Sequence, residues 1–181
     1  MSAINPIAES SALEAALPRQ SSAIARDLRL NLKRVLEDGA LAREEALLAL
    51  LALATSVADE RLGAYARGQL EAAGIGAEQI QEAAESAAIM GMLNVYYRFR
   101  HMLGNEDEYR AAGLRMTGLA RPALGKVRFE MLAFAVSVLN GCASCIRSHE
   151  QALRQAQVSV DKVHDLARLA AVVKGLNTLS R

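Results

Sequence analysis

The chain has 181 residues, about the size of one domain, and its 21 basic and 20 acidic side chains leave a formal net charge of +1. A charge so close to zero, with both signs interspersed, excludes the basic surface with which proteins bind nucleic acid or an anionic membrane. No Arg or Lys precedes Arg19, and the longest apolar run, residues 46–54, is far shorter than the roughly 20 residues that cross a bilayer. We therefore expect a soluble cytoplasmic protein with no leader, no membrane span and no nucleic-acid partner.

Helical patterns begin near the N-terminus. Pro6 and Pro18 bracket a short, weakly patterned piece, and apolar residues then recur at spacings of three and four between Leu28 and Leu36. Leu, Ala, Glu, Arg and Gln are frequent along the chain, and only three prolines occur. These residue types favour helix, so the sequence predicts an all-α fold.

The stretch of residues 104–125 interrupts the helical pattern. It mixes glycines and charges with Pro122, which is typical of an irregular connection. We expect a single domain over residues 1–181, with a first lobe at about 20–104, the connection at about 105–125 and a second lobe, which carries both cysteines, at about 126–181.

The two lobes are similar in sequence. Residues 70–94 align without a gap on residues 153–177, an offset of 83 positions. The identical pairs are Leu70/Leu153, Ala73/Ala156, Ala84/Ala167, Ala87/Ala170, Ala88/Ala171, Leu93/Leu176 and Asn94/Asn177. Such an internal repeat predicts two similar helical lobes. At the same offset, Asp59, Leu62, Ala66 and Leu47 of the first copy align with Cys142, Cys145, His149 and Glu130 of the second. We therefore expect one lobe to carry the reactive groups and the other to supply only scaffold.

Both cysteines lie where one predicted helix ends and the next begins. An apolar helical pattern stops at Asn140 and Gly141, because both residues tolerate the left-handed conformation of a helix C-terminus. With Cys142 near the N-cap of the following helix, Cys145 falls in its first turn and His149 one turn later on the same face. Backbone N–H groups and the helix dipole at this position stabilise a thiolate, the reactive form of cysteine.

Glu130 lies twelve residues before Cys142. An antiparallel hairpin of the two helices brings it back beside the second or third turn of the second helix, close to His149. Glu130, His149 and the thiols then form one chain for proton transfer. The same side chains leave two other interpretations open, a zinc site with Glu130 as its fourth ligand and an inert buried thiol pair.

The spacing of Glu130, Cys142, Cys145 and His149 resembles the E-x(11)-C-x(2)-C-x(3)-H signature of the alkyl hydroperoxide reductase AhpD family, part of the carboxymuconolactone decarboxylase-like superfamily. Further segments similar to this family are residues 26–32, 87–104 and 134–142, so the resemblance covers nearly the full chain. It implies a duplicated all-helical fold, a homotrimer and an antioxidant enzyme that reduces hydroperoxides with its thiols.

The resemblance also implies an electron route. Lipoamide on dihydrolipoamide succinyltransferase, kept reduced by dihydrolipoamide dehydrogenase and NADH, would supply electrons as dihydrolipoamide. The protein would pass them to the peroxiredoxin AhpC and, more weakly, to hydroperoxides directly. No bound cofactor and no metal are expected.

Roles for the four residues follow from the same resemblance. Cys145 matches the cysteine that passes through a sulfenic acid and forms the interchain disulfide with AhpC. Cys142 matches the proton donor that closes the redox disulfide with Cys145, His149 the base, and Glu130 the group that orients His149. The residues alone leave the order of the two cysteines open, because the N-terminal cysteine attacks in many C-x-x-C sites.

Ser144 departs from the family pattern, in which the residue before the second cysteine is typically a histidine that joins the proton relay. A serine can hold a water or donate a hydrogen bond, but it is far less basic. We expect weaker direct peroxidase activity and less affected disulfide exchange.

Two alternatives to this function remain at the level of sequence. One is a non-catalytic redox-sensing or zinc-stapled helical scaffold, and the other is a decarboxylase-type lyase of the same superfamily. The apolar residues Ile89, Met90, Met92, Val95 and Tyr96 are interpreted as core or subunit interface.

Overall fold

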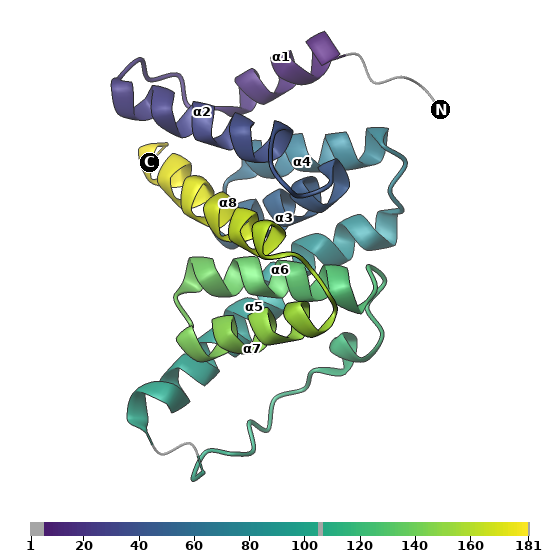
Figure 1. The fold of residues 1–181 in the computed structure, drawn as a ribbon, viewed down its shortest axis with the longest axis vertical. Helices are drawn as coiled ribbons and strands as arrows, with labels where there is room; N and C mark the ends of the chain where they lie inside the picture. The colour runs from purple at the N-terminus through teal and green to yellow at the C-terminus, as the bar shows by residue number, and fades with distance from the viewer. Residues whose placement is uncertain (1–5, 105–106, 181) are drawn as a thin grey trace.

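In the computed structural model, which describes residues 6–104 and 107–180, every regular element is a helix (Figure 1). The helices are α1 (Pro6–Ala16), α2 (Ala23–Glu37), α3 (Arg43–Ser56), α4 (Glu60–Ala72), α5 (Ala77–Leu103), the short 3-10 helix η1 (Thr117–Ala120), α6 (Lys126–Asn140), α7 (Ala143–Gln155) and α8 (Val160–Leu179). The predicted all-α fold is confirmed. In the described part of the chain, none of the helices combines the length and the apolar character that crossing a bilayer requires.

The helices α3, α4 and α5 repeat as α6, α7 and α8. Helices α4 and α7 both have 13 residues. Helix α7 starts 83 positions after α4, and helix α8 starts 83 positions after α5. The backbone agrees as well, because Asp59, the N-cap of α4, has φ −90° and ψ 91°, and Cys142, the N-cap of α7, has φ −89° and ψ 92°. The duplication predicted from the sequence is therefore confirmed, down to the turn that carries the first cysteine.

The third helix of each copy packs across onto the other copy. Helix α5 contacts α3 of its own copy and α6 and α7 of the second, while α8 contacts α6 and also α3 and α2 (Figure 1). Residues 46–54 of α3 and 131–137 of α6 are all buried, which explains why these stretches lack the one-sided apolar pattern of a surface helix. The two copies share one hydrophobic core rather than forming separate ones.

The connection between α5 and α6 is irregular in its described part except for η1. Gly104 ends α5 with φ 73°, a left-handed conformation that glycine adopts without strain. At the other end, the Glu82 carboxylate of α5 accepts hydrogen bonds from the backbone N–H groups of Ala123 (2.9 Å) and Leu124 (2.7 Å). This anchor holds the end of the connection against α5, just before α6 begins. Residues 105–106 of the predicted connection lie outside the described residues.

Candidate dithiol–disulfide site

The turn between α6 and α7 places both cysteines at the start of a helix. Gly141 ends α6 with φ 67°, and the Cys142 N–H donates back to the Ser137 carbonyl (3.1 Å). Cys142 is the N-cap of α7, and its Sγ accepts a hydrogen bond from the Cys145 N–H (3.4 Å). Sulfur thus occupies the place that Ser, Thr or Asp oxygen takes at most helix N-termini, as Asp59 does in the first copy.

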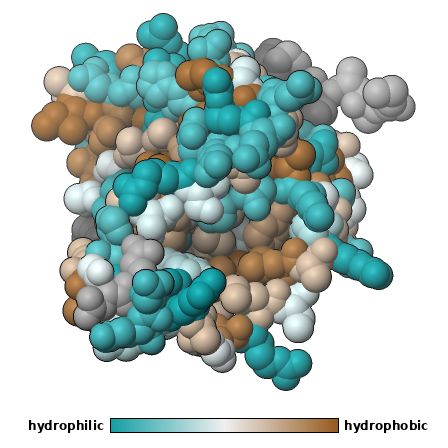
Figure 2. Space-filling view, turned by 60° about the horizontal axis from the view of Figure 1, so that its bottom comes forward, coloured by the Kyte–Doolittle hydropathy of each residue, from teal (hydrophilic) through white to brown (hydrophobic). Residues whose placement is uncertain are grey.

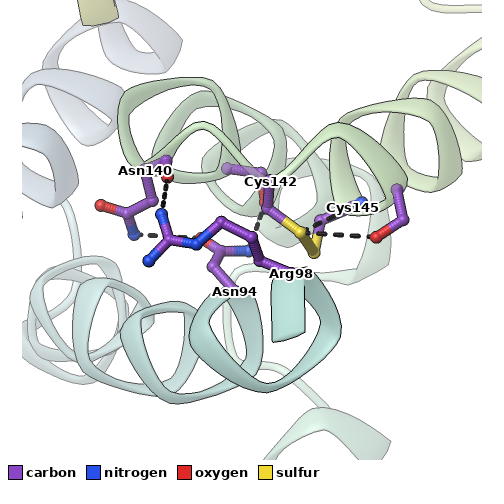
Figure 3. Close-up of a disulfide and its surroundings, with 7 residues drawn as sticks. Asn94, Arg98, Asn140, Cys142 and Cys145 are labelled. Carbon is purple, nitrogen blue, oxygen red and sulfur yellow. Dashed lines mark hydrogen bonds between the residues drawn. A yellow bond between two sulfur atoms is a disulfide. The ribbon is translucent and has the colours of Figure 1, made fainter. Parts of the chain in front are cut away.

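Cys142 and Cys145 are joined by a disulfide, with their Cα atoms 5.3 Å apart (Figure 3). The two sulfurs differ in surroundings. Cys142 is fully buried, whereas Cys145 is 6% exposed and lines a pocket. A reagent in this pocket therefore meets Cys145. The Ser144 hydroxyl, which lines the same pocket, lies 3.6 Å from the Cys142 sulfur.

His149 and Glu130 form a hydrogen-bonded pair across the two helices. His149 Nδ1 lies 2.7 Å from Glu130 Oε2, and both side chains line the pocket that contains Cys145. With Glu130 as a carboxylate, Nδ1 carries the proton and donates it, which leaves Nε2 as the acceptor for a further proton. The helical hairpin thus brings together the histidine, the carboxylate and the cysteine pair that the sequence singled out.

A polar network from α5 holds the end of α6 that precedes Cys142 (Figure 3). The Asn94 side-chain amide donates to Ser137 Oγ (2.9 Å), and its Oδ1 accepts from Asn140 Nδ2 (3.0 Å). The Arg98 guanidinium donates to the Asn140 backbone carbonyl (2.7 Å), one of the carbonyls that a helix C-terminus leaves without an intrahelical partner. In the sequence, Asn94 stands out only as part of the repeat and Arg98 has no predicted role, because their partners lie more than 40 residues away.

The pocket beside Cys145 has a volume of about 660 Å³ and is walled mainly by apolar side chains. Its lining residues are Met90, Leu93, Tyr97, Arg100, Met116, Leu119, Pro122, Lys126, Phe129, Glu130, Ser144, Cys145, Ser148 and His149. The prediction that Met90 belongs to the core is confirmed, and its side chain also forms part of this wall. Met116 and Leu119 come from the irregular connection, for which the sequence offered no signal of a role in the site.

A second hollow, of about 720 Å³, lies between α2 and α8 and contains no cysteine. Its buried carboxylate, Asp165, accepts from the Ala40 N–H (2.6 Å) and from the Arg168 guanidinium (2.9 Å). The bond from Ala40 ties α8 to the loop after α2, and the bond from Arg168 lies within α8, so both have a structural task. Among residues 6–104 and 107–180, no three or more His, Cys, Asp or Glu side chains are gathered as possible metal ligands.

A cysteine pair at a helix N-terminus and a His–Glu pair lie in the second copy of a duplicated helical fold and share a pocket that α5 of the first copy helps to line, which defines a dithiol–disulfide centre. The model of the carboxymuconolactone decarboxylase family matches residues 109–181, the segment that carries all four residues. Over most of its length, this chain is similar to proteins named alkyl hydroperoxide reductase AhpD. The relative from Anaeromyxobacter dehalogenans (strain 2CP-C) is 44% identical, with 90% of this chain and 85% of the relative aligned. The relative from Brucella suis is 41% identical, over 83% and 86%, and that from Streptomyces avermitilis is 39% identical, over 92% of each. The chain belongs to the AhpD family.

Proposed function

We propose that the protein is an oxidoreductase that reduces hydroperoxides and disulfides by cycling Cys142 and Cys145 between dithiol and disulfide. One observation carries the proposal: the disulfide presents one sulfur, Cys145, to a pocket that also holds the His149–Glu130 pair. The names of the relatives, alkyl hydroperoxide reductases, agree with this chemistry.

The reaction begins with the reduced pair. His149 takes the proton of the Cys145 thiol, and the thiolate attacks one peroxide oxygen, so that the O–O bond breaks. The leaving alkoxide takes up a proton and departs as an alcohol, and Cys145 becomes a sulfenic acid. The Cys142 sulfur then attacks Cys145 Sγ, the S–O bond breaks, and the hydroxyl leaves as water with the Cys142 proton. The products are one alcohol, one water and the disulfide.

The burial of the two sulfurs supports this division of roles. Cys142 is fully covered, so an external peroxide or disulfide reaches Cys145 first, while Cys142 is placed to attack Cys145 from within the protein. The unequal burial of the two sulfurs thus favours, without any family resemblance, Cys145 as the sulfur that reacts first.

Reduction of the disulfide requires an external dithiol. Dihydrolipoamide supplies two thiols, one of which attacks Cys145 to give a mixed disulfide, and the second releases lipoamide and the reduced pair. In the proposed cycle, dihydrolipoamide succinyltransferase and dihydrolipoamide dehydrogenase keep this donor reduced in the cytoplasm, and AhpC is the main acceptor, through an interchain disulfide with Cys145.

The proposed homotrimer is supported by an apolar face on α5. The large apolar side chains exposed on its second half are Met92, Val95, Phe99, Met102 and Leu103. In Figure 2, which turns the lower end of Figure 1 toward the viewer, apolar surface lies in patches among polar side chains. An apolar face of this kind marks a protein contact. Light scattering that gave the mass of a single 19.4 kDa chain would contradict the trimer.

The test follows NADH consumption in a mixture of dihydrolipoamide dehydrogenase, lipoamide, the protein and an organic hydroperoxide, with and without AhpC. Cys142→Ser, Cys145→Ser and His149→Ala are expected to lose the rate, whereas His164→Ala, which changes a histidine outside the pocket, is expected to keep it. Stimulation by AhpC identifies the peroxiredoxin as the acceptor. No NADH consumption above background would instead point to a lyase or a scaffold, because neither passes electrons from a dithiol to a peroxide.

A further inference from the structure

The wall of the Cys145 pocket has a chemistry that a small peroxide does not need. Seven of its described side chains are apolar or aromatic and come from three separate segments. They are Met90, Leu93 and Tyr97 of α5, Met116, Leu119 and Pro122 of the connection, and Phe129 of α6. The volume of about 660 Å³ is in the range of pockets that enclose an organic ligand. Hydrogen peroxide would leave most of this apolar surface in contact with water.

The same pocket carries two cations. Arg100 lies with its guanidinium carbon 5.5 Å from the centre of the Tyr97 ring, and Lys126 is exposed at the first position of α6. Among the described residues, Glu130 is the one carboxylate in the lining, and it is hydrogen-bonded to His149. The described part of the wall is therefore mainly apolar, with two cationic side chains and one carboxylate.

We propose that this pocket selects hydroperoxides of long-chain carboxylic acids, that is, fatty acid hydroperoxides. The inference rests on the proposed function and specifies its substrate class. Such a molecule has an apolar chain, a hydroperoxide within the chain and a carboxylate at its end. These three parts match the apolar wall, the Cys145 sulfur and the cations Arg100 and Lys126, all of which belong to one pocket.

The chemistry is that of the proposed cycle, with the acid as the substrate. The Cys145 thiolate attacks the hydroperoxide, the O–O bond breaks, and the hydroxy fatty acid leaves after it takes up a proton. Cys142 then closes the disulfide and releases water. The carboxylate takes no part in bond making, so it acts on binding and leaves the intrinsic reactivity of the peroxide unchanged.

The experiment isolates the peroxide half of the cycle from the electron donor. The protein is reduced with dithiothreitol, desalted and mixed with a hydroperoxide below its micelle concentration, and the loss of thiols is followed with time. Three substrates are compared at low ionic strength: linoleic acid hydroperoxide, its methyl ester and tert-butyl hydroperoxide. The ester keeps the chain and the hydroperoxide of the acid but replaces its charged carboxylate with a neutral methyl ester, and tert-butyl hydroperoxide lacks the chain.

The variant Lys126→Gln removes one cation of the wall, and Lys174→Gln, at an exposed lysine of α8 outside the pocket, is its matched control. We expect the unaltered protein to react about three- to fivefold faster with the acid than with the ester. This ratio corresponds to the free energy that a partly exposed ion pair contributes. Lys126→Gln should reduce this ratio toward one without changing the rate with the ester, and Lys174→Gln should keep it. Leu119→Ser should slow acid and ester alike, and by a larger factor than tert-butyl hydroperoxide, which has no chain to contact this wall.

Equal rates for acid and ester in the unaltered protein would overturn the proposed selectivity, as would a Lys126→Gln variant that slows all three substrates equally. Either result leaves the proposed function standing, because thiols are still consumed. If no hydroperoxide consumes thiols, the proposed function itself is wrong, and the substrate class is wrong with it.

Discussion

Asn94→Ala tests whether the buried network of α5 supports the cysteine turn. Asn94 is 1% exposed and makes two side-chain hydrogen bonds, to Ser137 Oγ and from Asn140 Nδ2. The substitution removes both bonds and leaves the Ser137 hydroxyl, which is 0% exposed, without its donor. Asn140 is half-buried and can turn to water, so the main cost comes from Ser137.

The expected loss of folding free energy is about 3 kcal/mol. Two hydrogen bonds contribute about 1 kcal/mol each, and a buried hydroxyl that loses its partner adds about 1–3 kcal/mol, reduced where the hydroxyl finds a backbone carbonyl. In a chain of this length each kcal/mol lowers the Tm by about 2–4 °C, so the predicted decrease is about 6–12 °C. Thermal unfolding followed by circular dichroism measures it.

The repeat supplies the matched control. Asn177 is the equivalent of Asn94 in the second copy, but it makes one side-chain hydrogen bond, to the Val57 carbonyl (3.1 Å), and its buried Oδ1 has no hydrogen-bond partner among the described residues. Asn177→Ala should therefore cost only about 1 kcal/mol. It should leave the rate of thiol loss with tert-butyl hydroperoxide unchanged, whereas Asn94→Ala should lower it, because the network ends at the turn before Cys142.

A double variant shows whether the unpaired Ser137 hydroxyl causes the loss of stability in Asn94→Ala. In Asn94→Ala with Ser137→Ala both polar partners are gone, so the penalty for the unpaired hydroxyl disappears and about 1–2 kcal/mol should be recovered. The reasoning is refuted if Asn94→Ala and Asn177→Ala cost the same, or if Ser137→Ala adds to the loss instead of relieving it.

Three further predictions concern single positions. Glu130→Gln should slow thiol loss with hydroperoxide by about a hundredfold, because a neutral amide cannot stabilise the His149 imidazolium; an unchanged rate would show that the pair is only structural. Ser144→His should raise direct peroxidase turnover in the NADH assay, and no gain would count against the missing relay as the cause of weak activity. Ala58, with φ 56°, and Gly141, with φ 67°, occupy equivalent turns. Because glycine adopts this left-handed conformation without strain, Ala58→Gly should stabilise the protein and Gly141→Ala should destabilise it, each by about 1 kcal/mol in urea unfolding. Opposite signs would contradict this explanation.

The sequence predicted those parts of the site that depend on local chain geometry. Asn140 and Gly141 stop a helix wherever they occur, and a four-residue spacing keeps Cys145 and His149 on one face. Glu130 required only one further step, the assumption of an antiparallel hairpin. The predicted boundaries of the two lobes, by contrast, stay a prediction. The third helix of each copy packs against both copies, so the contacts between helices do not mark where one lobe ends.

The missed parts depend on contacts between distant segments. The donors that hold the end of α6 come from α5, and their asparagine and arginine look like any other polar helix residues in the sequence. Met116 and Leu119 reach the pocket because the Glu82 carboxylate anchors the end of the connection, and a carboxylate that binds backbone N–H groups more than 40 residues away has no local pattern. The unequal burial of the two sulfurs likewise depends on what packs around them.

Asp59 and Cys142 share one backbone conformation, and both accept a hydrogen bond from the third residue after them. The acceptor is a carboxylate oxygen in the first copy and a sulfur in the second, and sulfur can accept this hydrogen bond both in the disulfide and in the thiol. Helix α7 therefore keeps an acceptor at its first turn whether the pair is oxidised or reduced. The disulfide can then be reduced and formed again with little rearrangement of the backbone.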